Sequence, residues 1–128
     1  MRRRLMTALL LAVLASFAWA AAPAPQSSTI DGVTLTATLR IAGPLWGFDL
    51  ADNTHTQDLA DDPAKTARVF ADGVSGDAAL GWQGDPPGGH HRKGVLRFKP
   101  VSPAPRAIEL RIERPGEATP RSFLWTLR

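Results

Sequence analysis

The stretch VTLTATLRI (residues 33–41) alternates strictly between apolar and polar side chains. Its odd-numbered positions are Val, Leu, Ala, Leu and Ile, and its even-numbered positions are three threonines and an arginine. A period of two with threonines on the polar face is typical of a strand that buries one face in an antiparallel sheet. The pair Gly43-Pro44 follows and predicts the end of this strand.

The same alternation recurs along the chain and predicts further strands at 46–50, 67–71, 78–82, 94–98, 108–112 and 123–127. Asp62-Pro63 could begin a short helical turn within residues 58–66, because Asp caps helices and Pro suits their first position, but the sequence leaves open whether this turn forms. Residues 115–120 predict a hairpin turn, and the proline-rich residues 100–105 predict a crossing between two sheets. The expected fold class is all-β: an immunoglobulin-like antiparallel β-sandwich of about seven strands with Greek-key connections.

The beginning of the chain has the features of a secretory signal peptide. Three arginines at positions 2–4 precede an apolar run that ends in Ala18-Trp19-Ala20. Small residues at the first and third positions of such a triplet suit signal peptidase, and the run is short for a membrane span. We therefore expect a signal peptide at 1–20, a flexible lead-in at 21–28, a single domain at 29–128, and a periplasmic or secreted location.

Charge gives no reason to expect nucleic acid or an anionic membrane as a partner. The whole chain has 15 Lys and Arg against 12 Asp and Glu, which gives a net charge of +3. Without the three leader arginines the count is 12 basic against 12 acidic residues. The chain also has no Cys, which excludes disulfides, thiol nucleophiles and Cys zinc sites.

Four segments of the chain resemble bacterial extracytoplasmic immunoglobulin-like modules of unknown function, some of which are appended to anti-sigma factors. These segments are FAD at 70–72 and onward through Leu80, GVLRF at 94–98, IELRI at 108–112 and FLWTL at 123–127. The resemblance implies the sandwich fold and brings no catalytic residues with it. No cofactor and no membrane span after the leader are expected.

Two adjacent histidines offer one alternative function, the binding of a divalent metal ion. His90 and His91 lie in the loop GDPPGGHHRK (residues 84–93), and Asp85 in that loop adds an oxygen ligand. Imidazole suits Cu(II), Ni(II) or Zn(II). His55 becomes a third ligand only if its loop lies at the same end of the sandwich. A second cluster, Asp52, Asp58, Asp61 and Asp62, is more simply a solvated acidic loop than a Ca²⁺ site.

A carbohydrate-binding module is the other alternative, with Trp46 or Trp82 as a stacking platform. Both tryptophans are in phase with apolar residues, which favours core packing, and Trp46 is the better candidate for partial exposure because glycines and a proline flank it. Catalysis is the least favoured class, because no serine lies in a nucleophile motif. The leading hypothesis is a non-catalytic exported module that contacts another envelope or exported protein through a sheet edge or the 84–93 loop, including Arg92 and Lys93.

Overall fold

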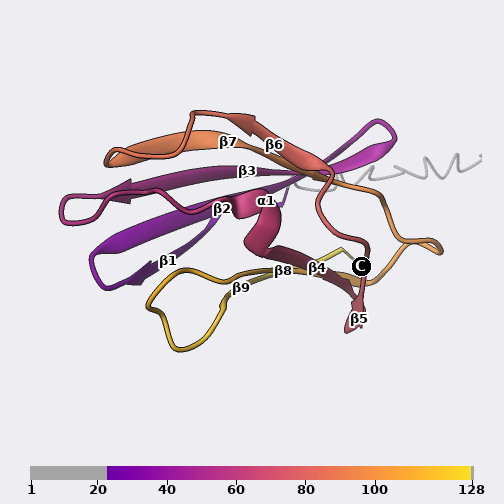
Figure 1. Cartoon of the computed structure of the whole chain (residues 1–128). Helices are drawn as coiled ribbons and strands as arrows, with labels where there is room; N and C mark the ends of the chain where they lie inside the picture. The colour runs from indigo at the N-terminus through magenta and orange to yellow at the C-terminus, as the bar shows by residue number, and fades with distance from the viewer. Residues whose placement is uncertain (1–22, 128) are drawn as a thin grey trace, which may run out of the picture.

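The computed structural model describes residues 23–127, so the predicted signal peptide lies outside the described residues. The described residues form nine strands and one helical turn (Figure 1). Their bounds are β1 Gln26–Ile30, β2 Val33–Ala42, β3 Leu45–Thr54, α1 Pro63–Thr66, β4 Ala67–Ala71, β5 Val74–Ser75, β6 Gly81–Gly84, β7 His91–Phe98, β8 Ala107–Ile112 and β9 Arg121–Thr126. Sheet A has the order β1-β2-β3-β7-β6, and sheet B has the order β5-β4-β8-β9. All strand pairs are antiparallel, which confirms the prediction of an all-β fold with two antiparallel sheets.

The two sheets form two layers that share one apolar core (Figure 1). The inward positions of β2 are buried, as the alternation predicts, and so are those of β3, β4, β7, β8 and β9. Aromatic side chains join the layers: the ring centres of Phe48 in β3 and Trp125 in β9 lie 5.6 Å apart, and Phe48 contacts Phe98 edge-on at 5.5 Å. Burial of these large side chains is the main source of stability in a fold without disulfides.

Two Asp-Gly turns close the short hairpins of the fold. Asp31 and Gly32 have φ of 49° and 75° and join β1 to β2, and Asp72 and Gly73 have φ of 49° and 79° and join β4 to β5. Such left-handed pairs are the two-residue turns whose twist matches antiparallel strands. The Asp72 carboxylate also accepts the backbone N–H of Ala107 at 3.0 Å, which fixes this turn to the start of β8.

The structure answers the open question about residues 58–66: the helical turn α1 begins after Asp62. The Asp62 side chain accepts the backbone N–H of Ala64 at 3.0 Å, and Pro63 occupies the first turn. The connection at 100–105 leads from β7 in sheet A to β8 in sheet B, which confirms the predicted crossing.

Three predictions about the strands were wrong. The strand β1 includes residues 26–28, which the sequence placed in the flexible lead-in. Nine strands are present in residues 23–127 instead of about seven, because β1 and the two-residue β5 carry no clear apolar alternation. Ile41 is exposed although it is in phase with the core, and it lies one residue pair from the Gly43-Pro44 turn that closes the β2–β3 hairpin.

Candidate functional site

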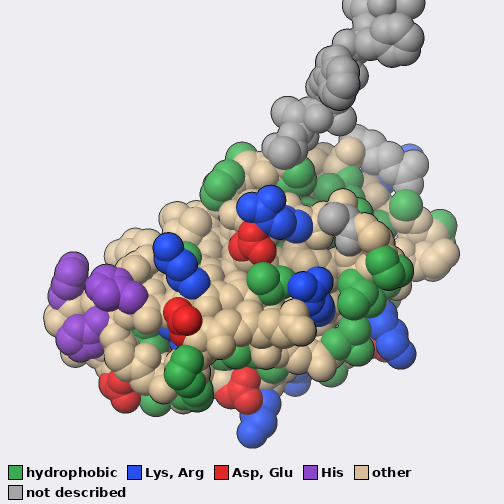
Figure 2. Space-filling model, turned by 90° about the horizontal axis from the view of Figure 1, so that it is seen from above, with side chains coloured by type: hydrophobic (Ala, Val, Ile, Leu, Met, Phe, Trp, Pro, Cys, Tyr) green, Lys and Arg blue, Asp and Glu red, His purple; other side chains and the backbone are tan. Residues whose placement is uncertain are grey.

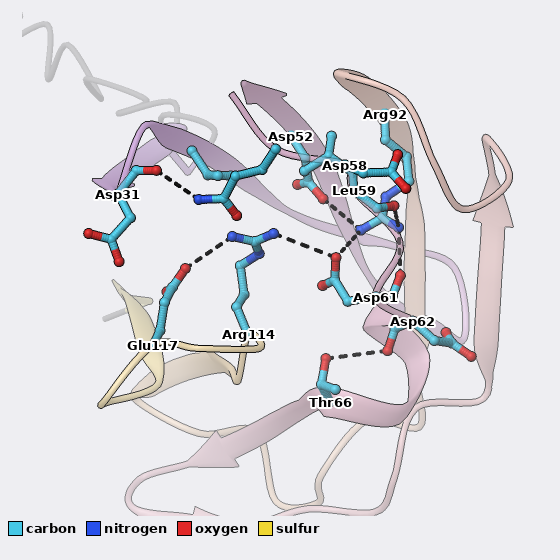
Figure 3. A network of polar contacts seen from close by, with 12 residues as sticks. Asp31, Asp52, Asp58, Leu59, Asp61, Asp62, Thr66, Arg92, Arg114 and Glu117 are labelled. Atoms are coloured by element: carbon cyan, nitrogen blue, oxygen red, sulfur yellow. Dashed lines mark hydrogen bonds and ion pairs between the residues drawn. The ribbon is translucent and has the colours of Figure 1, made fainter. Parts of the chain in front are cut away.

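The buried ion pairs and the histidines of the described residues lie at one end of the sandwich. Strand β3 ends there, β7 begins there, and the loops at 55–62 and 85–90 pack against each other. The histidine side chains gather at this end of the molecule (Figure 2), and Figure 3 shows a network of charged side chains that includes Asp52 of β3 and Arg92 of β7. Both features include one of two neighbouring rungs, or residue pairs, between strands β3 and β7, Asp52–Arg92 and Asn53–His91.

These two rungs point in opposite directions because successive side chains of a strand alternate between its faces. Asp52 faces Arg92 on the inward rung, and Asn53 faces His91 on the outward rung. The inward pair forms an ion pair of 3.0 Å, with the Arg92 side chain 1% exposed. On the outward rung, His91 Nδ1 lies 2.7 Å from Asn53 Oδ1.

Arg92 fastens the 55–62 loop to the core (Figure 3). One of its terminal nitrogens donates to the backbone oxygens of Leu59 at 2.8 Å and Asp61 at 2.6 Å. The other donates to the carboxylates of Asp52 at 3.0 Å and Asp61 at 3.2 Å. A buried cation needs this degree of pairing because an unpaired charge in the interior costs several kcal/mol.

A second part of the network joins the β8–β9 turn to the β1–β2 hairpin. Arg114 donates to Glu117 at 3.0 Å and lies 3.7 Å from Asp61, which links the two parts of the network. Arg121 forms a two-bonded pair with Glu117, both bonds being 2.8 Å. The hydrogen bonds from Arg121, with some help from Arg114, hold the pKa of Glu117 below its usual value in spite of burial.

Asp52 is the carboxylate of this network whose burial its partners compensate least. Burial raises the pKa of its carboxyl, and the hydrogen bond and charge of Arg92 offset that effect only in part. Across residues 23–127, three buried side-chain atoms lack a hydrogen-bond partner: Asp52 Oδ1, Arg92 Nε and Arg114 Nε. Unsatisfied atoms of this kind are uncommon in native proteins, and all three belong to this one network.

The histidines predicted as metal ligands lie at the same end of the fold. The ring centres of His55 and His91 are 6.2 Å apart, with the ring planes at 84°. His90 belongs to the same segment, and its backbone oxygen accepts the N–H of Thr54 at 2.9 Å. Over the described range no three or more His, Asp or Glu side chains are placed to hold a metal ion together, so a site of all three histidines is not formed.

Several backbone contacts hold the two histidine-bearing loops together. Leu59 N–H donates to Gly89 O at 3.0 Å, and Gly88 N–H donates to Leu59 O at 2.8 Å. The Asp58 carboxylate accepts the N–H of Gly89 at 2.6 Å, and the Asp85 carboxylate accepts the N–H of Lys93 at 2.8 Å. The first three bonds fix the two loops to each other, and the Asp85 bond fixes the shape of the 84–93 segment itself.

The two candidate tryptophans differ in exposure. Trp46 is only 5% exposed and belongs to the core, as its phase favours, so it is not the partly exposed exception of the carbohydrate-binding alternative. Trp46 lies on the same inward face of β3 as Phe48 and Leu50, and this position buries its side chain although glycines flank it in the sequence. Trp82 is half-buried: its indole N–H donates to Asp85 O at 2.9 Å, and its ring lies against Gly94.

The buried arginines and carboxylates correct two further expectations. Arg92 was predicted on an exposed loop, and the acidic cluster was predicted to be solvated, but Arg92 and Asp52 are buried and paired. Sequence reasoning also missed Asn53, Arg114, Glu117 and Arg121. A signal was present for Arg121, which is in phase with Phe123 and Trp125 in the alternation.

No model of a known protein family, no curated protein and no solved structure matches the chain. No comparison therefore assigns it to a family of enzymes. Within residues 23–127, no helix has the length and apolar character that a membrane crossing requires.

Proposed function

We propose that this chain is an exported, non-catalytic module of the immunoglobulin-like class that binds another exported or envelope protein through the β6 edge of sheet A. The strand order supports the class. β2-β3-β7-β6 in one sheet and β4-β8-β9 in the other correspond to the ABED and CFG sheets of immunoglobulin domains, with β1 and β5 as additions. The leader-like sequence at 1–20 supports export.

The observation that carries the binding proposal is a difference between the two sides of the sandwich. On the β1/β9 side, side chains of each sheet bond the backbone at the edge of the other. The Gln26 side chain bonds both the N–H and the C=O of Leu124, and Arg121 donates to the carbonyls of Ser28 and Ile30. The Trp125 indole donates to Ala24 O at 2.9 Å. This side has few backbone groups left for a partner.

On the β5/β6 side, the backbone edges remain accessible. Strand β6 is at the end of its sheet, and in the described part of the chain its backbone pairs with β7 only. Two exposed apolar side chains flank this side, Leu80 at 51% and Val74 at 66% exposure. Leu80 borders a shallow hollow of about 180 Å³ that Leu45, Gln83 and Arg97 also line.

An extended segment of another protein is the partner that this edge fits best. A free edge offers backbone hydrogen bonds to an added strand, and apolar side chains beside it select the residues of that strand. The balanced charge of the chain after the leader favours no strongly acidic or basic partner.

The test is site-specific photo-crosslinking in the native compartment. A photoreactive residue is placed at position 80 and, in the matched control, at position 124, which is similarly exposed on the closed side at 56%. We expect a defined protein adduct from position 80 and none from position 124. Equal adducts from both positions, or none from position 80, would refute binding at β6. Mass spectrometry of the mature N-terminus tests export separately, with cleavage after Ala20 as the expected result.

A further inference from the structure

We propose that His55 and His91 form an open two-imidazole binding site for a borderline divalent cation such as Zn²⁺, Ni²⁺ or Cu²⁺, with water in the remaining coordination positions. The inference is independent of the β6 edge, which lies at the margin of the sheet. The sequence pointed to the neighbours His90 and His91 as metal ligands, whereas the proposed site uses His55 and His91, which the fold brings together. Imidazole is the side-chain ligand that these three ions have in common.

The distance between the two rings suits a shared ion. An ion bound through imidazole nitrogen lies 2.0–2.1 Å from that nitrogen and about 3 Å from the ring centre. Two rings on one ion therefore have centres roughly 5 to 6 Å apart. The rings of His55 and His91 are 6.2 Å apart, and both residues are exposed, so a small rotation of the side chains brings them into range.

The hydrogen bond to Asn53 prepares His91 for this role. An amide oxygen only accepts hydrogen bonds, so Asn53 Oδ1, 2.7 Å away, selects the tautomer of His91 with a proton on Nδ1. The lone pair of the neutral ring is then on Nε2, which is free to bind a cation. Metal-binding histidines almost always donate their second nitrogen to such a partner, because the bond fixes the ring and increases its basicity.

The backbone beneath the pair is held in place. Asn53 and His91 are paired residues of β3 and β7, and the next rung inward is the buried Asp52–Arg92 ion pair. His55 directly follows Thr54, the last residue of β3, and the backbone N–H of Thr54 donates a hydrogen bond to the backbone oxygen of His90 at 2.9 Å. A site on such fixed elements needs little reorganisation to bind a ligand.

The local charge also permits a cation. Arg92 follows His91 in sequence, but its guanidinium points inward and is neutralised by two buried carboxylates. Asp58 and Asp85 lie in the two loops that meet here, and Lys93 is the exposed cation of the same segment.

His90 provides the matched control because it is exposed and is the neighbour of His91. The untagged protein is titrated calorimetrically with Zn²⁺ and Ni²⁺, and so are the variants His55→Ala, His91→Ala and His90→Ala. We expect one ion per chain in the native protein. Because loss of a supporting hydrogen bond alone costs about 10- to 100-fold in metal affinity, loss of either ligand should weaken binding by at least about tenfold. His90→Ala should change the affinity less than about threefold, a margin well below that effect.

A second pair of variants tests the positioning role of Asn53. Asn53→Ala should weaken Zn²⁺ binding by about tenfold without changing the unfolding midpoint, whereas Asn53→Asp, which still accepts the Nδ1 proton, should retain binding. Ring signals of His55 and His91 should shift together on titration. The proposal is overturned if the native protein shows no saturable binding, or if His90→Ala weakens binding as much as His91→Ala.

Discussion

Replacing Arg121 by lysine tests how much the buried network contributes to stability. The Arg121 side chain is 0% exposed and makes five hydrogen bonds: to the carbonyls of Ser28, Val33 and Ile30, and two to Glu117. Lysine has the same charge, but its single nitrogen has three donors and cannot form the two-bonded pair with a carboxylate. At least two of the five bonds are therefore lost.

Each hydrogen bond to a charged group contributes about 1.5–3 kcal/mol, so the loss of two of them lowers the free energy of unfolding by about 3–6 kcal/mol. For a domain of about 100 residues, a loss of this size lowers the melting temperature by roughly 15–30 °C. Because whole domains are stable by only about 5–15 kcal/mol, the effect is easily measured.

Urea denaturation followed by tryptophan fluorescence measures the change, since Trp46 and Trp125 are buried and become solvated on unfolding. The control is Arg40→Lys, because the Arg40 side chain is 66% exposed and pairs with Asp49 at the surface. Such surface pairs contribute at most about 1 kcal/mol. If Arg121→Lys costs less than about 1 kcal/mol, then the network does not stabilise the fold in the way that its hydrogen bonds imply.

Three further predictions follow from contacts elsewhere in the fold. Gly94→Ala places a Cβ 2.3 Å from the Trp82 ring and should cost about 1–3 kcal/mol in urea denaturation, whereas Gly81→Ala, with open space around its Cβ position, should be near neutral. Glu117→Gln should make the stability of the fold depend less on pH in the acid range. The lowered pKa of Glu117 stabilises the fold above the ordinary value of 4.5, and this contribution is lost as the pH falls through the folded-state pKa. Melting temperatures measured at a series of pH values below 4.5 should therefore differ less in the variant than in the native protein. Gln26→Ala should uncover the β9 edge and produce concentration-dependent oligomers in analytical ultracentrifugation; a monomer at all concentrations would show that Gln26 does not protect this edge.

Local alternation was sufficient to predict most of the strands. A half-buried strand imposes a period of two on its own residues, so β2, β8 and β9 are visible in the sequence without knowledge of their neighbours. Strand β1 is not, because QSSTI has only one large apolar residue and all five of its residues are partly or fully exposed. It exists because its backbone pairs with β2 and its carbonyls meet Arg121, and both contacts depend on the tertiary fold.

The sequence indicated which histidines belong to the candidate site but not how the fold arranges them. The sequence identified His55, His90 and His91 as potential ligands, but the proximity of His55 to His91 depends on the register of β3 against β7. The buried network was missed because a charged residue in an apolar phase is easily taken for the start of a loop. Asp52 and Arg92, 40 residues apart, stabilise each other in the interior only as a pair.

The bonds between Gln26 and Leu124 also set an order of events during folding. These two residues are 98 positions apart, and so the first strand of the fold waits for the last one before its side of the sandwich can close. Contacts this distant in sequence slow folding, because a long loop must be ordered before they form. Before β9 is in place, this side of the sandwich has two unprotected edges, β1 on sheet A and β8 on sheet B. The step most exposed to misassembly is therefore the docking of β9, which closes this side.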